Sequence, residues 1–97
     1  MNLIAIEYKL EDYELPDHLY LTGSLDIEID CVDGSPYIWA FQLNVHNGET
    51  GRTVEHFYQQ GRKDNWLPSI DILRELHRDK KLMDLIWEEC AHEGMWD

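Results

Sequence analysis

The stretch from Ser24 to His46 constrains the fold of this chain more than any other part of it. Residues 24–32 and 37–46 both follow a period of two: aliphatic residues alternate with acids in the first half, and the larger apolar side chains take every second position in the second half. That period is typical of strands with one buried face. An Asp-Gly-Ser-Pro run at 33–36 separates the two halves and has the composition of a turn. The stretch therefore predicts a β-hairpin.

The register of this hairpin can be predicted from the same residues. A two-residue loop would place Trp39 on the face that carries Asp26. A loop with an odd number of residues aligns Ile29 with Trp39 and Leu25 with Leu43, so that the apolar side chains share one face. Because a slip of one residue turns every side chain of a strand to the other face, we expect the second register, with Trp39 in the core.

Three further segments belong to the predicted sheet. Residues 3–10 alternate as a strand does, and residues 19–21 resume extended structure after the acidic segment 11–18, which we expect to be an exposed loop. Residues 53–58 suit either a strand or a short helix, and we favour a strand. The polar stretch 47–52, with two glycines, predicts the loop of a second hairpin.

The C-terminal third has the periodicity of an amphipathic helix. Ser69 follows Pro68 and is a candidate N-cap, and an apolar stripe continues from there to Cys90. Asp79 interrupts the stripe, and one continuous helix would be about 35 Å long, so we expect a kink or break there with Asp79 as a cap. The predicted fold is a single α+β domain over residues 1–97. It has a small antiparallel sheet of about four strands and a C-terminal helix, kinked or split near Asp79, packed on one face.

Charge is the strongest global feature. The 97 residues hold 20 acids and 8 Lys or Arg, a net charge of −12, and ten of the acids but only one of these bases lie in residues 1–50. Such a field repels nucleic acid and anionic membranes and attracts basic proteins. We therefore expect a basic protein partner, with no direct binding of nucleic acid or membrane.

The compartment can also be predicted. The apolar run near the N-terminus is short and lacks a positive flank, so it does not predict a signal peptide. No segment approaches the length of a transmembrane helix. Cys31 and Cys90 are expected to be buried free thiols. These features favour a cytoplasmic protein.

No motif points to a metal, a cofactor or catalysis. The histidines match no zinc spacing, and the acids between 26 and 33 alternate with apolar residues instead of following a calcium loop. Gly51-Arg52-Thr53 does not complete a phosphate-binding loop, and no serine lies in a nucleophile-elbow motif. We therefore expect a non-enzymatic protein without metal or cofactor.

The acids of the first hairpin strand suggest a function. Asp26, Glu28 and Asp30 are two residues apart, so on a strand they form a row of charges spaced by about 6.5–7 Å. Such a row can protect a sheet from edge-to-edge aggregation. It can also imitate the phosphates of nucleic acid and occupy a basic groove, as small acidic inhibitors and immunity proteins do.

We therefore hypothesise a small acidic binding protein that blocks a basic partner, either a nuclease toxin or a nucleic-acid-binding defence complex. The alternative is a structural or homo-oligomeric subunit whose acidity serves solubility only, so both a monomer and a homodimer are considered. Buried aromatic anchors dominate many interfaces, which adds two tryptophans to the predicted partner surface. That surface comprises Asp26, Glu28, Asp30, Asp33, Glu11, Asp12, Glu14, Asp17, Trp66 and Trp96.

Overall fold

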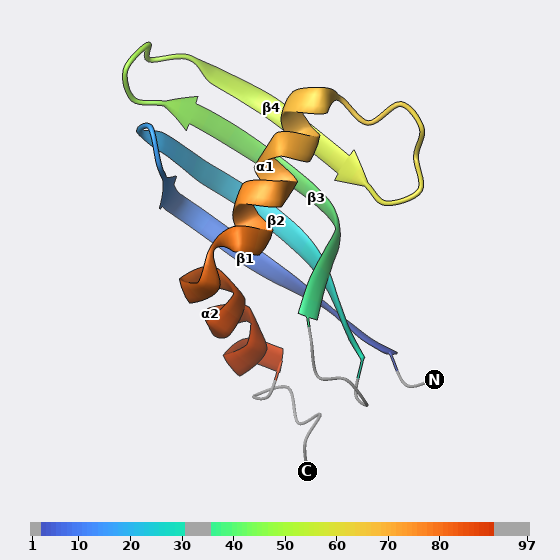
Figure 1. The fold of residues 1–97 in the computed structure, drawn as a ribbon. Helices are drawn as coiled ribbons and strands as arrows, with labels where there is room; N and C mark the ends of the chain where they lie inside the picture. Colours follow the sequence, from blue (N-terminus) through green and yellow to red (C-terminus); the bar gives the residue numbers. More distant parts are fainter. Residues whose placement is uncertain (1–2, 31–35, 91–97) are drawn as a thin grey trace.

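The chain forms a four-stranded antiparallel sheet followed by two helices (Figure 1). This computed structural model describes residues 3–30 and 36–90. The sheet order is β1-β2-β3-β4, so each strand lies beside its neighbour in sequence. The predicted α+β class with about four strands is confirmed, including a strand over residues 53–58. The elements are β1 (Leu3–Leu15), β2 (Leu19–Asp30), β3 (Pro36–Asn47), β4 (Thr53–Gln59), α1 (Leu67–Arg78) and α2 (Lys80–Cys90).

One apolar cluster joins the strands to the helices, and α1 crosses the sheet in Figure 1. Alternate side chains of β2 are fully buried, as the period of two predicts. We call the face that carries them the inner face, and the opposite one the outer face. Cys90 is buried as predicted, whereas Cys31 lies outside the described residues. The fully buried members of the cluster are Leu21, Leu25, Ile27, Ile29, Leu43, Leu76, Leu82, Ile86 and Cys90.

The predicted helix break at Asp79 is confirmed. Helix α1 ends at Arg78 and α2 begins at Lys80. The Leu82 N–H donates to Asp79 Oδ1 at 3.1 Å, which is the bond expected of an N-cap. The other carboxylate oxygen, Oδ2, accepts a hydrogen bond from the Tyr13 hydroxyl. Asp79 therefore begins α2 and also links that helix to β1.

The predicted N-cap of the first helix is wrong. Helix α1 begins earlier, with Trp66 as its N-cap, no side-chain capping bond and Pro68 in the first turn. Ser69 is therefore inside the helix, fully buried, with its Oγ 2.9 Å from His56 Nδ1. The reason is tertiary, since a polar group that leaves water needs a partner and His56 on β4 provides one.

The acidic segment 11–18 was predicted to be an exposed loop, and this is wrong for most of it. β1 continues to Leu15 along β2, and the register shifts between Leu10 and Tyr13. This shift is a β-bulge at which Asp12 has a φ of 47° and donates its N–H to Thr22 Oγ1 at 3.0 Å. Cross-strand pairing and the burial of Leu15 outweigh the acidic composition, which suggested a solvated loop.

The predicted hairpin register is wrong as well. Leu25 pairs with Phe41, not with Leu43, which keeps Phe41 and Leu43 on the inner face. A second register shift follows between Asp26 and Ile27, because Trp39 is an extra residue in β3. Residues 37–39, which precede the bulge in the chain, therefore point to the opposite faces from those that we predicted.

The consequence is that Ile38 is in the core and Trp39 is on the outer face. Ile38 is 2% exposed and pairs with Ile27, while Trp39 is half-buried beside Ala40. The Ile38 N–H donates to His77 Nε2 on α1 at 3.1 Å. This acceptor lies 39 residues away in sequence, so the local alternation of residues 37–46 could not indicate the bulge.

Candidate functional site

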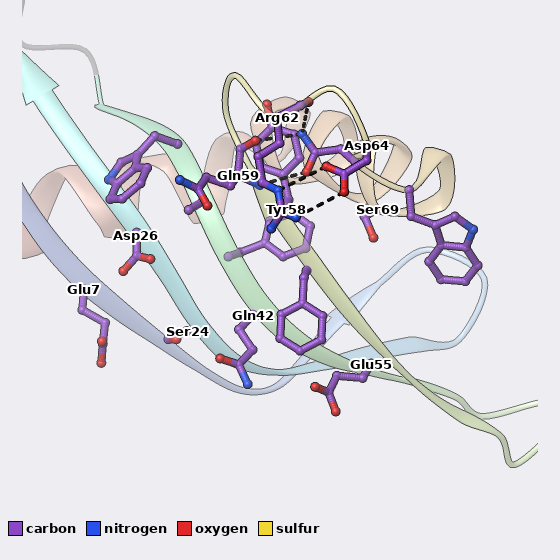
Figure 2. Close-up of a pocket in the computed structure, with 16 residues that line it drawn as sticks. Glu7, Ser24, Asp26, Gln42, Glu55, Tyr58, Gln59, Arg62, Asp64 and Ser69 are labelled. Atoms are coloured by element: carbon purple, nitrogen blue, oxygen red, sulfur yellow. Dashed lines mark hydrogen bonds and ion pairs between the residues drawn. The ribbon is translucent and has the colours of Figure 1, made fainter.

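A groove of about 660 Å³ is lined by outer-face residues of the sheet and by the loop that follows β4, and it also reaches Phe41, Tyr58 and Ser69 from the inner side (Figure 2). Cross-strand pairing brings its side chains together in rows. Glu7, Asp26 and Ala40 form one row, and Ser24, Gln42 and Phe57 form the next. A second hollow of about 560 Å³ adjoins it and shares Glu7, Ser24 and Gln42 with it. The outer face is therefore concave and polar, in contrast to the apolar inner face.

Carboxylates dominate the electrostatics of the groove. Glu7 and Asp26 are directly opposite on β1 and β2, a position in which like charges repel. Partial burial raises the pKa of the Asp26 carboxyl, and the nearby Glu7 charge raises it further. Glu55 lines the groove from β4 and Asp64 from the following loop (Figure 2). The groove thus holds four carboxylates, two of them in direct opposition.

Positive charge in the groove is already neutralised. Of the described residues that line it, Arg62 alone carries a cationic side chain. Its Nε and Nη2 each lie 3.2 Å from a carboxylate oxygen of Asp64. Because this pair cancels, the carboxylates of Glu7, Asp26 and Glu55 leave the groove with a negative field.

Aromatic side chains border these carboxylates. Phe57 and Trp66 are 52% and 53% exposed. Trp66 stacks on His56 with ring centroids 4.9 Å apart. Trp39 also lines the groove, and its indole Nε1 is buried without a hydrogen-bond partner among the described residues. Carboxylates beside exposed rings are the surroundings that lysine and arginine side chains prefer.

The predicted partner surface is brought together only in part. Asp26 and Trp66 line the groove. Glu28 lies on β2 but is half-buried and accepts a hydrogen bond from the Tyr37 hydroxyl. Asp30 is the last residue of β2, where its backbone pairs with Leu3.

The predicted acids of β1 and its turn lie elsewhere. Glu11 borders the adjoining hollow, and Asp12 Oδ1 accepts a bond from the Thr22 hydroxyl at 3.3 Å. Glu14 is exposed near the end of β1, and Asp17 is in the following turn with a φ of 68°. Two more predicted residues lie outside the described ones, namely Asp33 and Trp96.

Most residues of the groove were missed by sequence reasoning, among them Glu7, Trp39, Glu55, Phe57 and Asp64. The signal for Glu7 and Glu55 was present, because both alternate with inward-facing residues in segments predicted as strands. Trp39 was missed because the bulge reversed its face. Asp64 is in a loop whose path depends on tertiary bonds, including the one from Asn65 Nδ2 to the Gln59 carbonyl at 2.7 Å.

His56 and Ser69 are also brought together, 2.9 Å apart. A histidine beside a serine can activate a nucleophile. Here Ser69 lies at one end of the groove but is 0% exposed. Burial lowers the pKa of His56, which keeps the imidazole neutral. This contact therefore satisfies two buried polar groups between β4 and α1.

Within residues 3–30 and 36–90, no group of three or more His, Cys, Asp or Glu side chains could hold a metal ion. None of the helices in the same residues is long and apolar enough to span a membrane. No protein-family model matches this chain, and there is no match among curated proteins or solved structures.

Proposed function

We propose that this chain is a non-catalytic binding protein that holds a basic segment of another protein in the outer-face groove. The observation that carries the proposal is the pairing of free carboxylates with exposed aromatic rings in one concave surface whose lining cation is already neutralised. Basic proteins that act on nucleic acid, such as a nuclease toxin or a nucleic-acid-binding defence complex, are the class of partner proposed.

The electrostatics of Glu7 and Asp26 support this proposal. Two opposed carboxylates, one with a raised pKa, are unfavourable in the free protein. A lysine or arginine placed between them would relieve that repulsion, so binding energy is available there. The net charge of −12 would in addition speed the approach of a basic partner.

Binding of a cationic probe tests the proposal. A fluorescein-labelled peptide of alternating lysine and valine is titrated with the protein and followed by fluorescence anisotropy. We expect binding at low salt that is lost near 1 M salt, where charges are screened beyond about 3 Å. The double variant Glu7→Lys/Asp26→Lys should bind at least tenfold more weakly, because it replaces attraction by repulsion.

The matched control is the double variant Asp84→Lys/Glu88→Lys. Both residues are exposed on α2, outside the groove, and the change in net charge is the same. Its affinity should fall by less than that of the groove variant. Equal affinities for the two variants would show that net charge, not the groove, attracts the peptide, and absence of binding to the wild type would refute the proposal.

A further inference from the structure

Strand β4 lies at one edge of the sheet (Figure 1), and the direction of its backbone groups follows from two bonds. Asn47 N–H donates to the Arg52 carbonyl at 2.8 Å, and Gln60 N–H donates to the Trp39 carbonyl at 2.7 Å. In an antiparallel pair, hydrogen-bonded and non-hydrogen-bonded positions alternate. Counting from either bond gives the same result, namely that Val54, His56 and Tyr58 bond to β3. The alternate residues, starting with Thr53, direct their N–H and C=O groups away from the sheet.

One of these outward positions is closed by the protein itself. The Gln59 N–H donates to Asn65 Oδ1 at 3.1 Å, and Asn65 Nδ2 donates to the Gln59 carbonyl at 2.7 Å. The Asn65 amide thus occupies the place of a neighbouring strand. Thr53, Glu55 and Phe57 remain as an open edge about 13 Å long, and β3 is the one strand with which β4 pairs in the described part of the chain.

The two edges of the sheet differ in how they are protected. β1 carries a bulge at Asp12 and exposed charged side chains at Glu7, Lys9 and Glu11, which are devices that prevent pairing with another strand. β4 pairs with β3 without a register shift. It exposes Val54 and Phe57 at 42% and 52%. An open, regular edge with exposed apolar side chains is the template used in binding by strand addition.

We infer that the basic partner segment binds as an added fifth strand along β4. This inference rests on the proposed function and specifies the form of its ligand. Residues opposite Glu55 and Phe57 would share their face, and they would therefore extend over the acidic outer groove. The intervening residues would turn toward the inner side, where Val54 borders an apolar hollow of about 510 Å³. The ligand is an extended segment in which basic and apolar residues alternate.

A second copy of the chain fits this edge less well. Two copies would bring together two net charges of −12. A symmetric antiparallel pair centred on Glu55 would place two carboxylates directly opposite each other, which is destabilising. A basic strand instead meets Glu55 with opposite charge. Charge complementarity therefore selects a basic partner over a homodimer.

Backbone methylation of the probe peptide tests strand addition directly. In the alternating lysine–valine peptide, all lysine N–H groups face one edge and all valine N–H groups face the other. In an antiparallel complex the lysines opposite Glu55 and Phe57 bond to β4, so N-methylation of the lysines should weaken binding at least tenfold. N-methylation of the valines should leave it unchanged. The opposite result would indicate a parallel fifth strand, which also supports the inference.

A pair of protein variants tests strand addition through the backbone of β4 instead of the backbone of the peptide. Glu55→Pro and Glu55→Gln both remove the charge, but only proline removes the outward N–H, and this N–H is not used by β3. Glu55→Pro should bind the peptide at least tenfold more weakly than Glu55→Gln. If Glu55→Pro does not fold, the methylated peptides still decide the question.

The failures can be told apart. If both methylated peptides bind like their parent while Glu7→Lys/Asp26→Lys still weakens binding, the groove function stands and strand addition is overturned. If the unmethylated peptide does not bind, both the proposed groove function and strand addition are refuted. Sedimentation of the protein alone tests the second copy, because a homodimer that Glu55→Pro dissociates would assign the edge to self-association and overturn the inference.

Discussion

At the scale of single residues, Asp79 makes the most consequential contacts outside the groove. One carboxylate oxygen caps α2 through the Leu82 N–H, and the other accepts the Tyr13 hydroxyl of β1. Partial burial, followed by this bond and the Asp79 charge, raises the pKa of Tyr13, so the hydroxyl stays protonated and donates. The residue therefore fixes both where α2 begins and where it lies against the sheet.

Asp79→Ala should lower the free energy of unfolding by about 1–3 kcal/mol. A lost N-cap costs about 0.5–2 kcal/mol, and the Tyr13 hydroxyl would lose its acceptor. Urea unfolding measures the change. Asp84→Ala is the matched control, because Asp84 is exposed on the same helix and should change stability by less than about 0.5 kcal/mol. Equal effects of the two variants would contradict the role of Asp79.

Gly23 shows a different constraint at the same scale. It has a φ of 150°, and a Cβ built on it would lie 2.2 Å from the Gln42 carbonyl oxygen. Gly23 also pairs with Leu10, just before the register shift in β1. Only glycine permits β2 and β3 to approach this closely beside the bulge. The bulge itself lies on the neighbouring strand β1, between Leu10 and Tyr13.

At the scale of elements, two neutral histidines link helix α1 to the sheet. His77 Nε2 accepts the Ile38 N–H freed by the bulge in β3, and His56 Nδ1 contacts the Ser69 hydroxyl of α1. Burial lowers the pKa of both imidazoles below the usual value of 6.5. A protonated His77 could not accept the Ile38 N–H, so protonation removes the bond between helix and bulge.

The lowered pKa values of His56 and His77 predict how stability depends on pH. With lowered pKa values in the folded state, the unfolded chain binds more protons below about pH 6.5, so stability is full above that pH and falls as the pH drops toward the folded pKa values. Urea midpoints between about pH 7.5 and 5 measure the slope. His77→Gln should flatten this slope. An unchanged slope in His77→Gln would contradict the assignment.

The same elements show what could be predicted from the sequence. The break at Asp79 and the buried face of β2 depend on local spacing, and both were predicted. The bulge at Trp39 depends on His77, which is distant in sequence, and the strand path through Asp12 depends on pairing with Thr22. The bulge at Trp39 places that side chain in the groove, and the bulge at Asp12 lies beside the adjoining hollow, which Glu11 and Thr22 line. For this reason the sequence indicated an acidic face but named only Asp26 and Trp66 among its lining residues.

At the scale of the whole molecule, the two faces of the sheet have opposite properties. The inner face meets the helices in one apolar cluster, while the outer face carries the groove with its carboxylates. The shape is elongated, with extents of 46 × 28 × 18 Å. The opposed carboxylates of Glu7 and Asp26 lower the stability of the free protein, and the proposed binding of a basic segment would offset this cost.

This trade-off predicts opposite effects on stability and on binding. Asp26→Asn removes the repulsion with Glu7 and the cost of burying a charge whose pKa is raised, so it should stabilise the fold at pH 7 by about 0.2–1 kcal/mol. The same substitution should weaken binding of the lysine–valine peptide severalfold, because it removes a carboxylate from the groove. Urea unfolding and anisotropy titration at the same pH give the two values.

Glu28→Gln provides the contrast, because Glu28 is on the same strand and accepts the Tyr37 hydroxyl. A charge-assisted hydrogen bond is stronger than a neutral one, so this substitution should destabilise the fold. The pH adds a second check on Asp26. Because the Asp26 pKa is raised in the folded state, the folded protein binds a proton at a higher pH than the unfolded chain does. Lowering the pH toward about 4 should therefore stabilise the wild type and bring it closer to the stability of Asp26→Asn. If Asp26→Asn were instead less stable than the wild type at pH 7, Asp26 would have a stabilising partner in the fold. The outer face would then be a structural network and not a surface kept for a basic ligand.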